Sequence, residues 1–202
     1  MNDQELEIKL LVRDLKSIEE RLQSFGAALQ QERTHEINLR FDTPGNEFSK
    51  SAQAIRLRRD TAARMTYKGP SESRQGVRVR QEIEFVVDDF SAARNFLLAL
   101  GYVIIIIYEK YRTVYEYNGV LVTLDELPYG YFVEIEGQDP ASIMKVNQEL
   151  GLNWESKIPE SYIMMFNRIR QLEKLATRDL LFESINDREM AERVLRLKPA
   201  DG

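Results

Sequence analysis

Charged residues recur at alternate positions in several short segments of the chain, where they are interleaved with apolar residues. Because alternate residues of a β-strand point to the same side, each segment predicts a strand with one apolar face and one charged face. The charged positions are Glu5, Glu7, Lys9, Arg56, Arg58, Arg64, Lys68, Arg78, Arg80, Glu82, Glu84, Lys110, Arg112, Asp125, Glu134 and Glu136. An ordinary exposed sheet face explains any one of these strands, but here both signs of charge recur on strand after strand.

If these strands close into one sheet, their charged faces line a tunnel. Fixed charges of both signs are costly to enclose unless ligands or metals complete them. Basic side chains would bind a polyanion, and carboxylates would bind a divalent cation that bridges to it. Phosphoryl and nucleotidyl transfer need this combination, because their catalysis depends on positioning and charge neutralisation.

Several other kinds of site are excluded by composition. The chain has no Cys and a single His, His35, so a Cys nucleophile, a thiolate zinc site and a cluster of His ligands are impossible. We expect His35 to be a surface residue, because no nucleophile motif lies near it. A metal would have to bind carboxylates and carbonyls, which favours magnesium, manganese or calcium.

The charge and the apolar runs exclude two classes of partner. The net charge of −5 gives no basic field for nucleic acid. The longest apolar run, residues 103–107, is far too short to cross a membrane. Residues 1–5 are polar and acidic, unlike a signal peptide, and the lack of Cys agrees with a cytoplasmic location.

The same patterns predict the elements that must position these residues. Strands are predicted at residues 6–12, 29–41, 54–59, 64–68, 77–87, 102–117, 120–125 and 132–136, with a loop opening at 69–73. Helices are predicted at 15–24, 91–100 and 140–150, and helical spacing resumes from residue 161. The expected fold class is α+β: a closed or nearly closed antiparallel eight-stranded β-barrel with flanking helices. Residues 171–202 would form a helical C-terminal extension that packs on the barrel or on a partner subunit.

Short motifs along the chain carry a family resemblance. Residues 5–9 read Glu-Leu-Glu-Ile-Lys, which matches the ExExK signature of the CYTH superfamily, also called triphosphate tunnel metalloenzymes. Further matching segments lie at residues 41–44, 54–58, 66–70, 80–84, 109–112, 124–128, 130, 132–136 and 161–162. Their order and spacing resemble a CYTH domain over residues 1–170. The Tyr-Lys-Gly-Pro segment at 67–70 is most similar to the class IV adenylyl cyclase branch.

The resemblance implies a role for each charged residue. It implies a metal site, for Mg²⁺ or Mn²⁺, formed by Glu5, Glu7 and Glu136. It implies triphosphate binding by Lys9, Arg56, Arg58, Lys68, Arg80, Lys110 and Arg112. The catalytic set would be Glu5, Glu7, Lys9, Asp125, Glu134 and Glu136. Arg80, Glu82 and Glu84 would also pair among themselves in the lining, and Lys157 would close the tunnel mouth.

Three functions remain open from the sequence. A class IV adenylyl cyclase would use the ribose 3′-hydroxyl of ATP to attack the α-phosphorus, releasing pyrophosphate, and the branch resemblance favours this activity. A triphosphatase would use water to attack the terminal phosphorus of thiamine triphosphate, a nucleotide or inorganic triphosphate. A non-catalytic polyphosphate-binding module is the third, although it would not need the carboxylates.

Two further expectations concern particular segments. The family often has Asp and then Tyr shortly before the position of Phe41, where this chain has Asn38 and Arg40, so a wall of the tunnel is expected to differ. The apolar run at residues 103–107 would promote aggregation if exposed, so we expect a helix or a homodimer contact to cover it.

Overall fold

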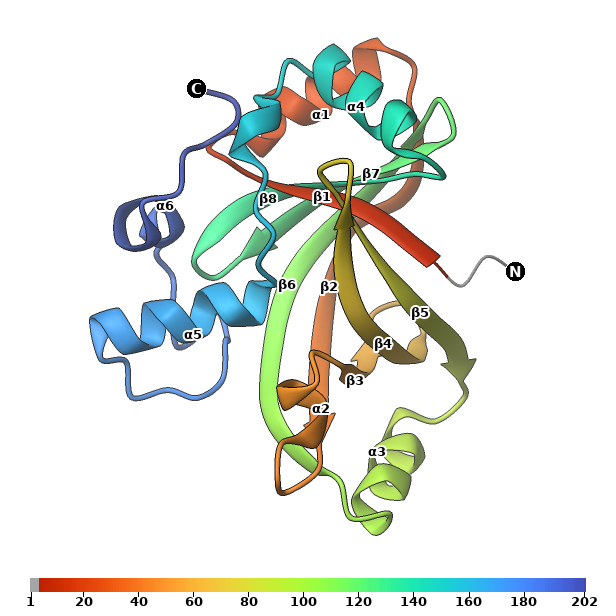
Figure 1. Ribbon diagram of the computed structural model, residues 1–202, viewed down its shortest axis with the longest axis vertical. Coiled ribbons are helices and arrows are strands. Elements are labelled where there is room, and N and C mark those ends of the chain that lie inside the picture. Colours follow the sequence, from red (N-terminus) through yellow and green to blue (C-terminus); the bar gives the residue numbers. More distant parts are fainter. Residues whose placement is uncertain (1–3) are drawn as a thin grey trace.

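The computed structural model describes residues 4–202, and its eight strands form one closed antiparallel barrel (Figure 1). The strands are β1 (Gln4–Val12), β2 (Ala28–Asp42), β3 (Ala54–Arg59), β4 (Ala63–Arg74), β5 (Val77–Val87), β6 (Val103–Tyr117), β7 (Val120–Leu127) and β8 (Gly130–Glu136). Their order around the barrel is β1-β5-β4-β3-β2-β6-β7-β8. The predicted fold class is therefore confirmed. Residues 1–3, which belong to the stretch used to exclude a signal peptide, lie outside the described part.

The helices lie around the outside of the barrel in three groups (Figure 1). They are α1 (Leu15–Ser24), α2 (Glu47–Lys50), α3 (Phe90–Ala99), α4 (Pro140–Glu149), α5 (Tyr162–Glu173) and α6 (Met190–Leu195), with a 3₁₀ turn at Trp154–Ser156. In the figure, α1 and α4 lie at one end, α2 and α3 at the other, and α5 and α6 along one side. None of the helices in residues 4–202 combines the length and the apolar character needed to cross a membrane.

Aspartates fix where the predicted helices begin. The side chains of Asp14, Asp89 and Asp139 accept hydrogen bonds from backbone N–H groups in the first turns of α1, α3 and α4. These bonds satisfy donors that a helix start leaves unpaired. The cap of α3 is thus Asp89, so this helix begins at Phe90, one residue before the predicted start at residue 91.

Most of the apolar core lies outside the barrel wall. Ile18 of α1 and Ile143 of α4 are fully buried against outward-facing residues such as Leu10 and Val133. A smaller cluster under α3 includes Phe41 and Leu57. The helices therefore stabilise the barrel from outside, which leaves the inward-facing side chains free to be charged.

One end of the interior is closed by apolar side chains. By alternate spacing, Leu11 and Phe132 continue the inward-facing rows of Lys9 and Glu134. Both are buried in a cluster that includes Phe166 of α5. Helix α5 therefore plugs the barrel on the side where β1 meets β8.

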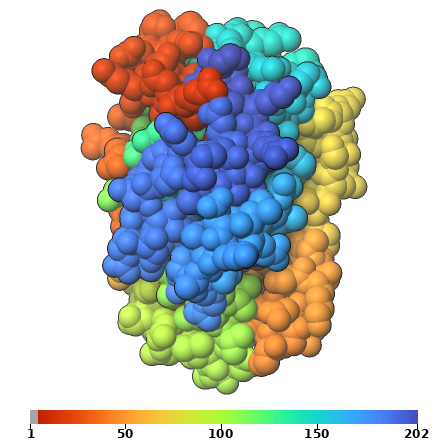
Figure 2. Space-filling model, turned by 90° about the vertical axis from the view of Figure 1, so that its left-hand side faces the viewer, coloured from red at the N-terminus to blue at the C-terminus, as the bar shows by residue number. Residues whose placement is uncertain are grey.

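The segment between α5 and α6 is irregular rather than helical, with one isolated parallel bridge from Leu180 to Tyr108 of β6. Residues 103–109 of β6 run beyond the part of β6 that pairs with β7, so one edge would be open. The Leu180 N–H donates to the Ile107 carbonyl (2.9 Å), and the Leu180 carbonyl accepts from the Glu109 N–H (3.0 Å). An oxygen of Asp179 accepts from the Ile107 N–H at 2.9 Å. The same chain thus covers the Ile107 end of the apolar run, whereas Val103 at the other end stays exposed. The C-terminal residues, blue in Figure 2, lie over this side of the molecule.

The first strand is completed in a similar way. Pairing of β1 with β5 extends from Gln4 to Glu7. Beyond this point, the Lys9 carbonyl accepts from the Ile158 N–H, and the Leu11 carbonyl accepts from the Ala200 N–H, both at 2.8 Å. Segments remote in sequence therefore take the place of β5 along the second half of β1.

The prediction of a loop at residues 69–73 is wrong. Strand β4 continues through this stretch to Arg74, and the ladder with β5 resumes at Ser71 opposite Arg80. Gly69 and Pro70 fall where the register shifts, between Lys68 and Ser71. Pro cannot donate to a ladder but is tolerated at such an irregularity, so these residues mark a bulge rather than the end of the strand.

Candidate active site

A cavity of about 500 Å³ lies inside the barrel, and charged side chains dominate its lining. The basic residues in the lining are Lys9, Arg40, Arg56, Arg58, Arg64, Lys68, Arg78, Arg80, Lys110 and Arg112. The acidic residues are Glu5, Glu7, Glu36, Glu82, Glu84, Glu134 and Glu136. Basic side chains thus outnumber acidic ones here, although the whole chain carries a net charge of −5. The structure brings together every residue of the predicted site, with Asp125 just behind the wall.

Carboxylates gather where β1, β5 and β8 meet. Glu5 forms ion pairs with Lys68 (3.1 Å) and Arg80 (2.6 Å). Glu7 pairs with Arg78 at 3.3 Å and lies opposite Glu136 in the β1–β8 ladder. Within residues 4–202, Glu136 has no ion-pair partner. Two of the three predicted metal ligands are therefore held by basic side chains, and the third is not.

The charges around these carboxylates set their pKa values in opposite directions. Two causes raise the pKa of Glu136 to about 7: burial inside the barrel and, after it, the negative charges of Glu5, Glu7 and Glu82. Part of the residue is nevertheless exposed to solvent. Burial also opposes ionisation of Glu5, but Lys68 and Arg80 outweigh it and lower the pKa of Glu5 well below its usual value. Negative charge is thus in excess beside Glu136.

These carboxylates fit a divalent metal by their donor chemistry. Mg²⁺ and Mn²⁺ prefer carboxylate oxygens, and no softer ligand is present. In the part of the chain that the structure describes, no three acidic side chains converge on one point. Glu5 and Glu7 would have to exchange their basic partners for the ion. Burial and, after it, the negative charges of Glu5, Glu7 and Glu82 raise the pKa of Glu136, and a divalent cation would neutralise those charges.

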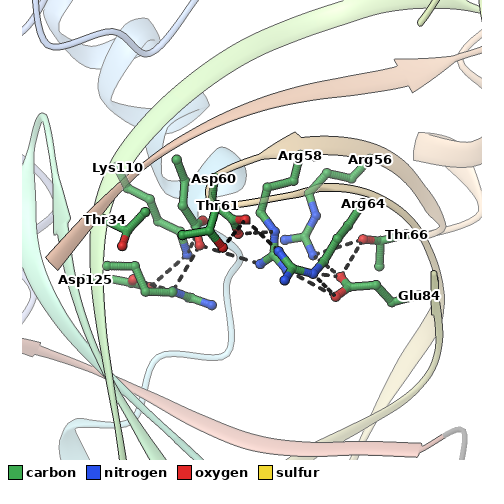
Figure 3. Close-up of polar contacts among 12 residues, drawn as sticks. Thr34, Arg56, Arg58, Asp60, Thr61, Arg64, Thr66, Glu84, Lys110 and Asp125 are labelled. Atoms are coloured by element: carbon green, nitrogen blue, oxygen red, sulfur yellow. Dashed lines mark hydrogen bonds and ion pairs between the residues drawn. The ribbon is translucent and has the colours of Figure 1, made fainter. Parts of the chain in front are cut away.

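A second cluster forms around Glu84 of β5, as Figure 3 shows. Its carboxylate accepts hydrogen bonds from Arg58 (3.1 Å), Arg56 (3.2 Å) and the Thr66 hydroxyl (2.8 Å). Arg64 lies 3.7 Å from it. One carboxylate therefore positions three guanidinium groups from β3 and β4, ready to bind an anion.

A third cluster is anchored by Asp125, which is fully buried. Its carboxylate accepts from Lys110 (3.1 Å), Arg112 (2.6 Å) and the Tyr162 hydroxyl (2.8 Å). Arg112 also pairs with Glu134 at 2.7 Å. Asp125 does not line the cavity, so its role is to orient Lys110 and Arg112.

Lys9 lies between these groups and the plug of α5. Its ammonium group is 3.2 Å from Glu134 and 4.3 Å from the centre of the Tyr162 ring. Burial opposes ionisation of Glu134, but Lys9 and Arg112 outweigh it and lower its pKa far below the usual value. Contacts with Glu134 and Tyr162 therefore hold the Lys9 side chain at the inner end of the cavity.

Several lining residues were not identified from the sequence, among them Glu36 and Tyr108. Glu36 is fully buried and lies 3.5 Å from Lys110 and 3.6 Å from Arg58. Burial opposes its ionisation, but Lys110, Arg112 and Arg58 outweigh it and lower its pKa to about 2. Tyr108 also lines the cavity. The alternation of Glu36, Asn38 and Arg40 with apolar neighbours could have revealed the inward row of β2.

Two other predicted positions lie outside the cavity. The Lys157 ammonium group donates to the Trp154 carbonyl and lies 3.9 Å from the centre of the Trp154 ring, so the structure does not place it in the lining. His35 packs on Tyr111 on the outer face, with 44% of its side chain exposed. The prediction that His35 is a surface residue is confirmed.

Comparisons with known proteins agree with this architecture. The CYTH domain model matches residues 3–162. A candidate adenylate cyclase from Vibrio parahaemolyticus is 18% identical, with a TM-score of 0.75 over 83% of this chain and 99% of that one. PH1819 from Pyrococcus horikoshii is 27% identical, with a TM-score of 0.66 over 81% of this chain and 98% of that one.

A third solved structure is HpAC1 from Hippeastrum, a candidate adenylyl cyclase with a dominant triphosphatase activity. It is 18% identical, with a TM-score of 0.62 over 81% of this chain and 95% of that one. No curated protein matches the chain. The domain match covers most of the chain, and the barrel with its charged interior is the expected architecture. The chain therefore belongs to the CYTH family of triphosphate-tunnel enzymes.

Proposed function

We propose that this protein is a divalent-metal-dependent triphosphatase that hydrolyses its substrate inside the barrel. The observation that carries the proposal is the cavity lining, in which 17 of the 26 residues are charged. Its aromatic residues are Tyr108 and Tyr162, and the Tyr162 ring is already engaged by Lys9 on its face and by Asp125 at its hydroxyl. Such a lining suits a chain of phosphates better than a stacked nucleobase.

The basic side chains would bind the phosphates. Lys9, Arg58 and Lys110 are each held by carboxylates before substrate arrives. A phosphate oxygen would replace part of each carboxylate contact, so little side-chain entropy is lost on binding. The site is thus organised in advance for a polyanion.

The acidic end would bind the metal. Glu5, Glu7 and Glu136 would hold Mg²⁺ or Mn²⁺, which, when bound, neutralises phosphate charge and acidifies water. In the hydrolysis, water attacks the terminal phosphorus, the bond from that phosphorus to the bridging oxygen breaks, and orthophosphate and the shortened phosphate chain leave. The guanidinium groups around Glu84 are placed to stabilise the negative charge on the phosphate oxygens.

The cyclase is the second candidate. The resemblance of residues 67–70 to the class IV branch favours the cyclase. A cyclase would use the same charged residues as the triphosphatase. A cyclase must also orient the ribose and base, for which the lining offers few apolar groups. We retain the cytoplasm as the proposed location, because triphosphates and Mg²⁺ occur there and the chain lacks Cys.

Product analysis separates these functions. The protein is incubated with Mn²⁺ and either ATP or inorganic triphosphate, and the products are identified by ion-exchange chromatography. Orthophosphate released from the substrate supports the triphosphatase. Formation of cyclic AMP and pyrophosphate from ATP would contradict the triphosphatase and support the cyclase. Tight binding of both compounds without any turnover would instead support a binding module.

A further inference from the structure

Tyr162, the first residue of α5, is the point where the plug of the barrel touches the charged side chains inside it. The residue lines the cavity, and only 8% of it is exposed. Its hydroxyl donates a hydrogen bond to the Asp125 carboxylate at 2.8 Å. Asp125 in turn contacts Lys110 and Arg112. A residue of the covering helix is thus one hydrogen bond away from two basic groups of the site.

The Tyr162 hydroxyl differs in origin from the other donors to Asp125. Those donors are Lys110 and Arg112, which both lie on β6, the strand that pairs with β7. Among residues 4–202, the Tyr162 hydroxyl is the one donor to this carboxylate that comes from outside these two strands. Long basic side chains have many rotamers, so a carboxylate held by them alone could move with them. A donor on a packed helix instead fixes the carboxylate, and with it the two basic groups.

Tyr162 is itself held in place by its neighbours. Ser161 caps α5 by accepting a hydrogen bond from the Met164 N–H at 3.3 Å. The Tyr162 carbonyl accepts from the hydroxyl of the fully buried Tyr129 at 2.9 Å. The Tyr162 ring packs edge-on against Phe132, with 5.1 Å between the ring centres. The hydroxyl therefore starts from a rigid position.

The segment before α5 and the charge state of the phenol agree with this role. The Ile158 N–H donates to the Lys9 carbonyl at 2.8 Å, which ties the chain that enters α5 to β1. The Lys9 ammonium group then lies 4.3 Å from the centre of the Tyr162 ring. Burial and, after it, the negative charge of Asp125 raise the pKa of Tyr162 well above its usual value. The hydroxyl thus keeps its proton and remains a donor.

We propose that Tyr162 is a positioning residue whose hydroxyl orients Lys110 and Arg112 through Asp125. Helix α5 therefore does more than close the barrel, because its first residue sets the geometry of two phosphate-binding groups. This inference rests on the proposed function, since it adds a residue to the machinery of the same cavity. Charged groups that are already oriented need no reorganisation when substrate binds.

The hydroxyl is tested with Tyr162→Phe, which keeps the ring and its packing. Tyr115→Phe is the matched control. Tyr115 is also buried, and its hydroxyl also donates to a carboxylate at 2.8 Å, but that carboxylate is Glu19 of α1, outside the barrel. The two variants therefore remove the same kind of hydrogen bond from opposite faces of the barrel wall.

Two measurements detect the effect. The first is the exchange of the Arg112 Nε–H with solvent, followed by NMR without ligand, because this group donates to Asp125 at 2.7 Å. The Arg80 Nε–H, which donates to Glu5 at 2.6 Å, is the internal reference in the same spectra. The second is calorimetric titration of inorganic triphosphate in the presence of a chelator. A general loosening of the fold would speed exchange at both arginines.

We expect Tyr162→Phe to speed exchange at Arg112 but not at Arg80, and to weaken triphosphate binding by roughly three- to tenfold. Tyr115→Phe should lower the unfolding temperature and alter neither measurement. Unchanged exchange at Arg112, equal acceleration at Arg80, or unchanged triphosphate affinity in Tyr162→Phe would each overturn the positioning role. If the expected pattern holds but the wild type releases no orthophosphate with Mn²⁺, the proposed triphosphatase fails and the positioning role stands.

Discussion

Glu7 and Glu136 lie directly opposite each other in the β1–β8 ladder, where two like charges destabilise a sheet. Arg78 and Arg80 lie within ion-pair distance of Glu7, but no such partner is present for Glu136 in residues 4–202. The fold therefore tolerates a repulsion at the place where a divalent ion would relieve it.

This relationship predicts the effect of removing either charge. Glu7→Gln and Glu136→Gln should each abolish metal-dependent turnover. Glu136→Gln should unfold at the same or a higher temperature than the wild type when metal is absent, because the repulsion is gone. Activity assays with saturating Mg²⁺ and thermal unfolding measure the two effects, with the exposed Glu20→Gln as control. Near-normal turnover in either site variant would show that the metal ligands lie elsewhere.

The raised pKa of Glu136 predicts a pH dependence of stability. The folded state holds a proton on this group up to about pH 7, whereas the unfolded chain releases it near 4.5. In this window the folded state binds more protons than the unfolded chain. The contribution of Glu136 to stability therefore falls as the pH rises from 4.5 to about 7, and it is constant above that. Urea unfolding of the wild type and Glu136→Gln across this window should show a steeper fall in the wild type. Parallel curves for the two proteins would contradict the prediction.

Arg58 is expected to serve both binding and stability. It lies 3.1 Å from Glu84, 3.2 Å from Asp60 and 3.6 Å from the buried Glu36. Arg58→Ala should weaken the binding of inorganic triphosphate by roughly tenfold or more. It should also lower the unfolding temperature, since removing one partner of a buried ion pair costs about 3–5 kcal/mol.

The neighbouring residue provides a matched control for this variant. Arg59 is exposed and packs on Phe90 outside the barrel. Arg59→Ala should leave triphosphate affinity nearly unchanged in calorimetry. If Arg58→Ala and Arg59→Ala behaved alike, Arg58 would not contact the substrate.

Asp179 is expected to protect the open edge of β6. Its carboxylate accepts a hydrogen bond from the Ile107 N–H at 2.9 Å, next to the pairing of Leu180. Asp179→Ala should speed hydrogen exchange at the Ile107 amide and lower the unfolding temperature, by a loss of about 1–3 kcal/mol. Glu183→Ala, an exposed change in the same segment, should alter neither. Unchanged exchange at Ile107 in Asp179→Ala would mean that this contact does not hold the segment in place.

The sequence predicted the strands and most of the cavity because both depend on local alternation. Glu5, Glu7 and Lys9 share a face in any strand, so closure of the sheet brings them inside. Alternation cannot distinguish a residue that lines a cavity from one that lies behind its wall, so the position of Asp125 was not predictable. That depends on the curvature of the barrel and on the hydroxyl of Tyr162, 37 residues away.

Other parts of the structure depend on distant contacts. The apolar spacing after α5 agrees with a helix, but hydrogen bonds to β6 hold residues 179–182 in an irregular, non-helical form. Gly69 and Pro70 are typical of a loop, but pairing of Ser71 with Arg80 continues the strand past them. In both places, tertiary hydrogen bonds outweigh the local preference.

The closure of β1 by Ala200 has a consequence for biosynthesis. Leu11 leaves the ribosome long before Ala200 does. The second half of β1 therefore cannot be fully paired until nearly the whole chain has emerged. The β6 edge must likewise wait for Leu180. Barrels built from such long-range pairings fold slowly, and exposed strand edges promote association between nascent chains. Chaperone binding to stalled chains that end before residue 179 should therefore exceed binding to the released protein.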